Sequence, residues 1–195
     1  MMDLEKQMTD LRFFAHSLQV QSTAMNENMT VSVIRYDNTR KPFVFDASLL
    51  PPDPSTYAKY IRPKPFGLWL SVGDAWKRFV RSEMLEASKT RWRFAHRFTI
   101  DKRDLVCVET VSEASELFAK FGQFSPTQKI GNMTFRSGLI DWSKVARANP
   151  DKCGVLVMFS RIRGEMSTTK EYHDSWIYGW DSDSVVLYRA PRTQT

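Results

Sequence analysis

Short apolar runs of the kind that form β-strands recur along this chain and alternate irregularly with stretches of helical periodicity. The predicted strands cover residues 30–36, 42–46, 66–71, 93–100, 105–108, 155–159 and 184–188. Because no strict strand–helix–strand rhythm links these runs, the sequence predicts an α+β fold rather than a doubly wound parallel sheet. The continuous apolar run over residues 105–108 predicts a central strand.

An amphipathic helix is predicted at the beginning of the chain. Residues 3–20 carry an apolar stripe at helical spacing, made of Leu4, Met8, Leu11, Phe14 and Leu18. The polar residues that follow predict a linker, so the chain divides into a helix with its linker (1–29) and a single α+β domain (30–190). An isolated helix of this length is marginal in water. We therefore expect it to pack on the domain or to mediate oligomerisation.

Three further helices are predicted inside the domain. The first follows residue 71 and has an apolar face made of Trp76, Phe79, Val80 and Met84. The second starts at Ser112 as its cap and runs to Phe121, and the third is a short turn capped by Asp141.

Three segments of the domain are predicted as loops. Residues 51–65 hold five prolines, residues 122–138 are rich in Gly, Ser, Thr and Asn, and residues 160–175 are charged. Proline fixes φ and removes a backbone donor, so the first of these is expected to contain no regular element. A long loop of this kind is often a lid or a binding segment.

The chain is basic. Its 195 residues include 28 Lys and Arg against 22 Asp and Glu, which gives a net charge of +6 and a pI near 9.4. The densest cluster consists of Lys77, Arg78, Arg81, Arg91, Arg93 and Arg97, beside Trp92. Two interpretations remain open: solvated faces of a helix and a strand, or a surface for an acidic macromolecule. No apolar run approaches the roughly 18 residues that span a membrane, so no membrane partner is expected.

Cys107 and Cys153 lie inside apolar runs, where a free thiol behaves as a small buried hydrophobe. We expect both to be reduced and unbridged. Without a CxxC pair, and with only three histidines in the chain, the sequence does not favour a zinc site. The polar N-terminus lacks the apolar core of a signal peptide, so a cytoplasmic location is predicted.

The stretch from Lys64 to Ser71 is a first candidate site. There a proline-rich loop enters a strand at Gly67, where backbone or ligand can approach closely, and the strand ends in a serine. At a strand end Ser71 can donate and accept hydrogen bonds in a cleft. The alternative is structural, with Leu68 to Leu70 in the core and Ser71 capping the next helix.

A second candidate site lies at residues 176–187. Trp176, Tyr178 and Trp180 precede the carboxylates of Asp181 and Asp183, which lead into an apolar run. Aromatic faces beside a carboxylate can hold a planar ring. An acidic turn with an aromatic core contact explains the same residues.

The familiar catalytic fingerprints are missing. The sequence has neither the glycine-rich dinucleotide pattern nor the P-loop pattern. A triad can be drawn from Ser71, His96 and Asp181, but no GxSxG motif supports it.

The order of three short motifs is informative. Lys64-Pro65-x-Gly67-Leu68-Trp69-x-Ser71, Ile140-Asp141-Trp142 and Trp180-Asp181-x-x-Ser184 follow one another along the chain. This order resembles a loosely defined group of phage and microbial proteins, and its arrangement over residues 31–188 resembles the ADP-ribosyltransferase superfamily. The resemblance implies a split, mostly antiparallel sheet flanked by short helices.

The resemblance also implies catalytic roles for three residues. Arg35 falls at the position of the family's basic residue on the first strand, Ser71 at the serine of the middle strand, and Asp181 at the catalytic acid. The family normally has Glu at this last position, often as ExE, whereas this chain has Asp181 and Asp183.

NAD is the substrate that such a site implies. Arg35 or Arg62 would hold its pyrophosphate by charged hydrogen bonds, and Trp69 or Trp180 would stack on the nicotinamide. Lys64 and Gly67 complete the predicted cofactor-binding residues, and a carboxylate would stabilise the oxocarbenium-like ribose. Arg93 and Arg97 would then steer an acidic acceptor, which the resemblance implies is a host macromolecule.

A second hypothesis belongs to another class. The chain would be a non-catalytic basic interaction module that binds nucleic acid or a host protein through its arginine-rich face. The two hypotheses differ in a spatial requirement: the enzyme needs Arg35, Ser71 and Asp181 in one cleft with aromatic walls, whereas the module needs contiguous basic residues.

Overall fold

A computed structural model describes residues 29–38, 40–41, 43, 48, 50, 52–83, 93–130, 133–166, 176–177 and 179–192. The helix predicted for residues 3–20 and its linker up to residue 28 lie outside these ranges, as does most of the strand predicted for residues 42–46. The expectation that the N-terminal helix docks or mediates oligomerisation therefore stays a prediction.

The described part of the chain contains short strands and short helices. The strands are β1 (Thr30–Asp37), β2 (Ile61–Arg62), β3 (Leu68–Val72), β4 (Phe94–Asp101), β5 (Leu105–Val108), β6 (Gly122–Phe124), β7 (Gln128–Ile130), β8 (Met133–Phe135), β9 (Gly138–Asp141), β10 (Gly154–Val157) and β11 (Ser184–Leu187). The helices are α2 (Ala75–Glu83), α3 (Val111–Phe121), α4 (Trp142–Ala148) and α5 (Phe159–Met166), with 3-10 turns η2 (Pro54–Thr56) and η4 (Lys102–Asp104).

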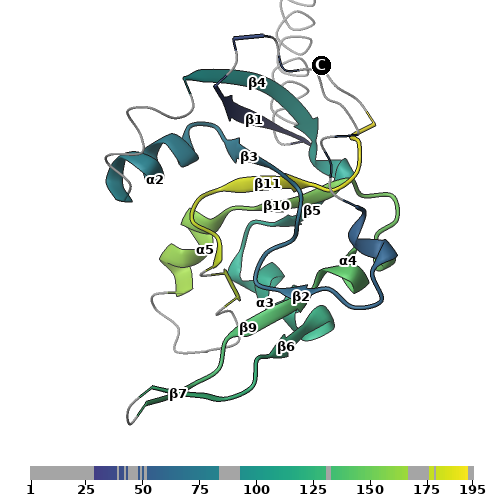
Figure 1. Cartoon of the computed structure of the whole chain (residues 1–195), viewed down its shortest axis with the longest axis vertical. Helices are drawn as coiled ribbons and strands as arrows, with labels where there is room; N and C mark the ends of the chain where they lie inside the picture. Colours follow the sequence, from purple (N-terminus) through teal and green to yellow (C-terminus); the bar gives the residue numbers. More distant parts are fainter. Residues whose placement is uncertain are drawn as a thin grey trace, which may run out of the picture.

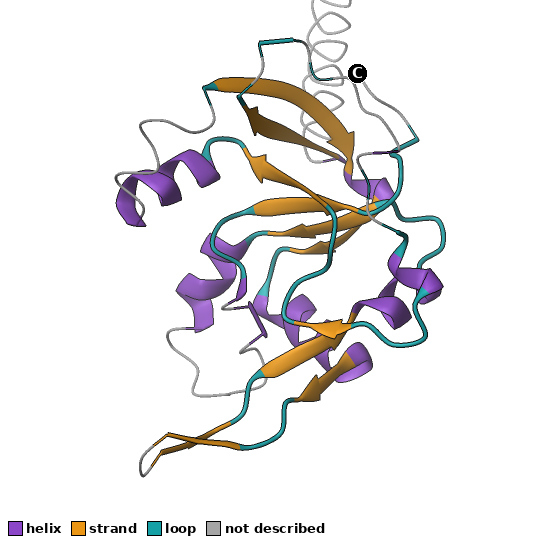
Figure 2. Ribbon diagram, in the orientation of Figure 1, coloured by secondary structure: helices purple, strands orange, loops and turns teal. Residues whose placement is uncertain are grey.

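A six-stranded sheet in the order β4-β1-β3-β11-β10-β5 forms the centre of the molecule (Figure 1). Every neighbouring pair in it is antiparallel except β10 and β5, which are parallel. A smaller antiparallel sheet, β2-β9-β6, lies on one side together with α3 and α4 (Figure 2). The predicted α+β class with a mostly antiparallel sheet is thus confirmed. The run at 105–108 is a strand, but it forms an edge of the sheet and not its centre.

The central strands β10 and β11 are buried on both faces. Along β11, Val186 belongs to one hydrophobic cluster, whereas Val185 and Leu187 belong to another on the opposite face. The first cluster also contains the fully buried Trp142 and Trp180 and fills the space next to the smaller sheet. A strand that packs on both faces reads as a continuous apolar run, which is why the sequence predicted β11 correctly.

Helix caps set several of the element boundaries. Asp141 caps α4 as predicted, because its carboxylate accepts the backbone N–H of Lys144. The cap of helix α3 lies two residues earlier than expected: it is Thr110 and not Ser112, and Glu113 completes a capping box.

Three predicted loops contain regular elements. The segment 122–138 forms β6, β7 and β8 and begins β9, and the proline-rich segment 51–65 contains η2 and β2. The segment 160–175 is helical up to residue 166, so the strand predicted to end at residue 159 ends at Val157. Strand β2 depends on pairing with the distant β9, whereas β7 and β8 pair with each other inside the segment 122–138.

Both cysteines are free thiols, Cys153 buried and Cys107 half-buried. Burial raises the pKa of Cys153 to about 12 and that of Cys107 to about 11. A thiol with such a pKa is a poor nucleophile at neutral pH, which is consistent with the structural role expected for both residues.

Candidate functional site

Strands β1 and β3 are paired over a short stretch only. Residues 33–34 of β1 pair with residues 71–72 of β3, whereas β1 pairs with β4 along its whole length. Beyond the paired stretch, residues 35–36 on β1 and residues 69–70 on β3 line a common pocket instead of continuing the ladder. The end of this ladder therefore positions the pocket.

The pocket has a volume of about 310 Å³, at the lower end of the range of small-molecule sites. Segments that are far apart in the sequence contribute its lining, which consists of Ile34, Arg35, Tyr36, Lys64, Trp69, Leu70, Ser71, Trp76, Asp181, Ser182 and Ser184. The three residues predicted as catalytic are among them, and so are two of the five predicted cofactor contacts. The aromatic lining residues provide partly apolar walls.

Arg35 brings an unsatisfied donor to this pocket. Its Nε atom is buried and has no hydrogen-bond partner among the described residues. A buried donor without a partner costs about 1–3 kcal/mol. Two core residues among those described, Trp176 and Tyr188, also have such a polar atom, but of the three only Arg35 lines the pocket. An anionic oxygen of a ligand would satisfy this donor and the guanidinium charge together.

Lys64 and Asp181 form an ion pair within the pocket lining, with 3.1 Å between Nζ and Oδ2. The Lys64 ammonium also lies 5.3 Å from the ring centroid of Trp69, close enough for a cation–π contact. The two charged side chains are 37% and 43% exposed, so Asp181 lies at the rim and is not enclosed between aromatic rings. An exposed pair of this kind is worth at most about 1 kcal/mol, and a competing cation can displace it.

The hydroxyl group of Ser71 is engaged in local hydrogen bonds. It accepts the backbone N–H of Trp76 at 2.9 Å and donates to the carbonyl of Gly73 at 2.9 Å. Ser71 thus caps the start of α2, which was the structural alternative considered for it. This cap fixes Trp76 against the pocket, so Ser71 acts on the site by positioning another residue.

The two carboxylates at the end of the chain have different surroundings. Asp183 is buried and accepts hydrogen bonds from the backbone N–H and the hydroxyl of Ser160, both at 2.7 Å. It therefore holds the first turn of α5, and it does not line the pocket. Of the pair, only Asp181 presents its carboxylate to the site.

Three residues predicted to contact the cofactor lie elsewhere. Trp180 is fully buried, donates its indole N–H to the carbonyl of Pro63, and packs behind Trp69 with 5.0 Å between ring centroids. A Cβ at Gly67 would come within 2.2 Å of Val186, so this glycine is required by packing against β11 and not by a ligand. Arg62 is exposed on β2 and does not line the pocket.

Tyr36 and Trp76 are pocket residues that the sequence did not single out as site residues. Burial raises the pKa of Tyr36, and Asp74 adds to this increase, while Arg97, Arg78 and Arg81 oppose it. The position of Tyr36, directly after Arg35 at the end of a strand, was the one available signal. His96 pairs with Arg35 across β1 and β4 but is not part of the pocket lining, which leaves the triad of Ser71, His96 and Asp181 without geometric support.

Comparison of the chain with protein-family models, with curated proteins and with solved structures gives no match. Within the described residues, no helix has the length and apolar character needed to cross a membrane. No group of three or more potential metal ligands of the His, Cys, Asp or Glu type occurs in that part of the chain.

Proposed function

We propose that the pocket binds NAD and transfers its ADP-ribose to a macromolecular acceptor. One observation carries this proposal: Arg35, Ser71 and Asp181 come from three separate parts of the chain and line a single pocket with aromatic walls. This convergence is what distinguishes the enzyme from a basic module with dispersed residues. The cytoplasm, where NAD is available, is the compartment in which such an enzyme would act.

Opposite charges within the pocket match the pyrophosphate and the nicotinamide of this substrate. The unsatisfied Nε of Arg35 suits an oxygen of the pyrophosphate. The corner formed by Asp181 and Trp69 already accepts a cation, the ammonium of Lys64. The nicotinamide ring of NAD is cationic and planar, so it would replace that ammonium beside the carboxylate and the indole face.

In the proposed reaction the bond between the ribose C1′ and the nicotinamide nitrogen breaks, and nicotinamide leaves with the bonding electron pair. A nucleophilic oxygen or nitrogen of the acceptor, or water, forms the new bond to C1′ and releases its proton. Positive charge develops on the ribose in between, and Asp181 would stabilise it by electrostatic attraction. Ser71 contributes by fixing α2 and Trp76, and it forms no bond to the substrate.

Nicotinamide release from NAD tests the proposal. We expect Asp181→Asn to slow release by about 100-fold, because it removes charge stabilisation of the transition state. NAD affinity should fall by no more than about fivefold, because the attraction at this exposed position is worth at most about 1 kcal/mol. The matched control is Asp151→Asn, since Asp151 has a similarly exposed carboxylate and does not line the pocket. If the native protein neither binds NAD at millimolar concentration nor labels any component of a cell extract, the proposal fails. The basic interaction module then becomes the better account.

A further inference from the structure

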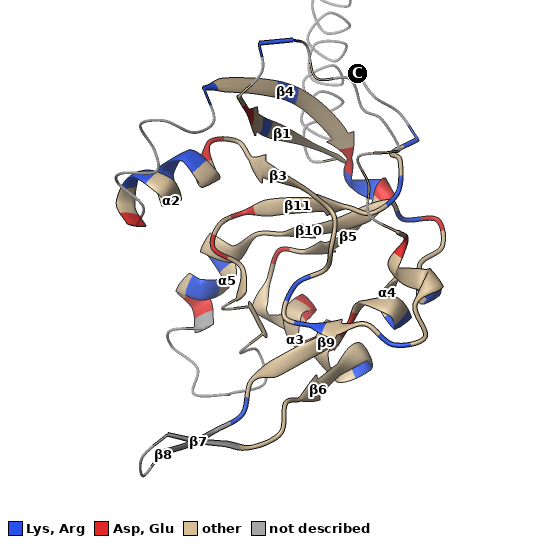
Figure 3. Ribbon diagram, viewed as in Figure 1, with Lys and Arg blue, Asp and Glu red and all other residues tan. Residues whose placement is uncertain are grey.

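Three arginines lie on two elements that adjoin the pocket-lining residues: α2 carries Trp76, and β4 pairs with β1. Arg78 and Arg81 lie on α2, and Arg97 lies on β4; we call them the rim arginines. Arg97 pairs directly with Ile34 across β1 and β4, which places it on the sheet face of a pocket-lining residue. In Figure 3 the ribbon is blue at the Lys and Arg positions of α2 and β4.

All three rim arginines interact electrostatically with one pocket residue, Tyr36. Each of them acts to lower the pKa of Tyr36, against the larger effect of burial. Tyr36 itself lines the pocket. Positive charge from α2 and positive charge from β4 therefore act on the same pocket-lining residue.

The charged groups of the rim arginines are in contact with solvent. All three rim arginines are exposed. Arg78 pairs with Asp74, but both side chains are more than half exposed, so water screens this pair. Arg81 and Arg97 form no ion pair with a carboxylate among the residues that the structure describes. Together with Asp74, the three rim arginines thus keep a net positive charge that can attract an anionic partner.

Aromatic rings accompany this charge. On α2, Trp76 and Phe79 are stacked with 5.3 Å between centroids, and both are half-buried. Tyr36 adds a third half-buried ring. Cations that track phosphates beside rings that stack on bases are the combination by which proteins bind single-stranded nucleic acid. An acidic protein would use the charge alone, and a duplex keeps its bases stacked inside.

We infer that the rim arginines and the neighbouring rings of Tyr36, Trp76 and Phe79 bind single-stranded nucleic acid at the mouth of the pocket. If the pocket has the activity proposed above, this strand is the acceptor. Binding itself requires no catalysis. A base or sugar hydroxyl of the bound strand would then supply the nucleophile that forms the bond to C1′ and loses its proton.

Fluorescence anisotropy with a labelled oligothymidylate of about 15 nucleotides tests the inference, because this length fits the site sizes of single-strand binders. The variant carries Arg78→Gln, Arg81→Gln and Arg97→Gln together. Three lost phosphate contacts reduce the salt dependence of log K against log salt by about 2, which corresponds to about 100-fold weaker binding at 0.1 M salt. Titration at several salt concentrations measures both quantities.

A matched control removes three exposed cations from other parts of the molecule through Lys59→Gln, Lys120→Gln and Arg136→Gln. We expect this control to bind within about threefold of the native chain, since distant charges act through a screened field. Equal losses in the two triple variants would overturn the inference, because they would show attraction by net charge only. Binding of polyglutamate in preference to the oligonucleotide would overturn it in favour of an acidic protein partner, and equal affinity for duplex and single strand would also contradict it.

The two proposals fail in different assays. The rim arginines do not line the pocket, so we expect their replacement to leave the hydrolysis of NAD by water unchanged. Oligonucleotide binding by a chain that does not cleave NAD would refute the proposed function and support the surface. Cleavage of NAD without oligonucleotide binding would refute the surface alone.

Discussion

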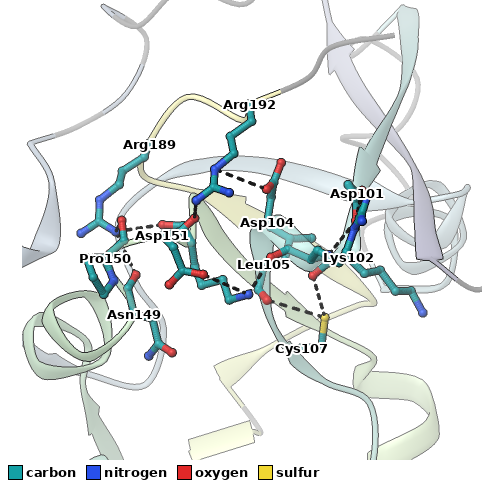
Figure 4. A network of polar contacts seen from close by, with 12 residues as sticks. Asp101, Lys102, Asp104, Leu105, Cys107, Asn149, Pro150, Asp151, Arg189 and Arg192 are labelled. Carbon is teal, nitrogen blue, oxygen red and sulfur yellow. Dashed lines mark hydrogen bonds and ion pairs between the residues drawn. The ribbon is translucent and has the colours of Figure 1, made fainter.

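Two ion pairs connect the flanks of β11 to the proline-rich segment, and their charged groups are satisfied to very different degrees. After β11, Arg189 pairs with Asp53, and the two side chains are 21% and 28% exposed. Before β11, Asp181 pairs with Lys64 at the more exposed rim of the pocket. The guanidinium of Arg189 also donates to backbone carbonyls, including those of Asn149 and Pro150, which lie beside it in Figure 4.

Arg189 and Arg35 differ in how completely their guanidinium groups are hydrogen-bonded within the protein. The first stabilises the fold, and the second has a donor available for a ligand. Every nitrogen of the Arg189 guanidinium has a partner. Arg35 has a buried Nε with none among the described residues. A fully hydrogen-bonded network rigidifies the structure around it, whereas an unsatisfied donor in a pocket is destabilising until an acceptor, such as an anionic oxygen of a ligand, binds to it.

The largest expected effect follows replacement of the saturated arginine. Arg189→Met leaves Asp53 and several carbonyls without their donor, and we expect the free energy of unfolding to fall by about 3 kcal/mol. For a chain of this size the melting temperature should drop by roughly 6–12 °C. Thermal unfolding followed by circular dichroism measures the change. If Arg189→Met lowered the free energy of unfolding less than Arg35→Met does, the structural role assigned to Arg189 would be wrong.

A smaller effect, in a different quantity, is expected for the unsatisfied arginine. Arg35→Met removes a contact to the ligand anion, so we expect NAD affinity to fall by roughly 10- to 100-fold. The free energy of unfolding should not fall and can rise by about 1 kcal/mol, because no partner among the described residues is lost and the variant removes the unsatisfied donor. Calorimetric titration and urea unfolding measure the two quantities. Unchanged affinity together with a large loss of stability would assign Arg35 a structural role.

The pH dependence of stability tests whether the ion pair between Asp53 and Arg189 stabilises the fold. Burial acts to raise the pKa of Asp53, but hydrogen bonds from Arg189 and Ser55 outweigh it and hold the pKa below its usual value. The stability that this carboxylate contributes is therefore present above about pH 4 and is lost as the pH falls through its folded-state pKa. In Asp53→Asn the decline of stability below about pH 4 should be shallower than in the native chain. Parallel pH profiles of the melting temperature would contradict this assignment.

The smallest effect is expected for the exposed ion pair between Lys64 and Asp181. Lys64→Met breaks the ion pair with Asp181, yet both side chains are more than a third exposed, so water screens their attraction. We expect the free energy of unfolding to change by less than about 0.5 kcal/mol, which urea denaturation can measure. A decrease in the free energy of unfolding as large as that of Arg189→Met would show that the ion pair between Lys64 and Asp181 also stabilises the fold.

The sequence predicted those features whose cause is local. Strand β11 is a continuous apolar run, and Asp141 stands directly before the helix that it caps. The family resemblance suggested Arg35, Ser71 and Asp181 as site residues, and the structure brings them to one pocket.

The remaining features depend on contacts between distant segments. Helix α5 is capped by Asp183 from beyond its own end, so its first turn has no local signal. Trp69 and Trp180 look alike in the sequence, but only the fold decides which ring faces the pocket and which packs behind it. The edge position of β5 likewise depends on its pairing with β10 alone.

The central place of β11 also governs when, during synthesis, the candidate pocket can be completed. β11 lies between β3 and β10, and without it the strands β4-β1-β3 and β10-β5 share no ladder. Asp181 stands just before it and enters the pocket lining only when these residues have left the ribosome. A nascent chain or a proteolytic fragment that stops before residue 180 therefore has two unjoined half-sheets with exposed apolar faces and an incomplete site. Such a fragment is expected to aggregate or to be degraded before it can act on anything in the cell.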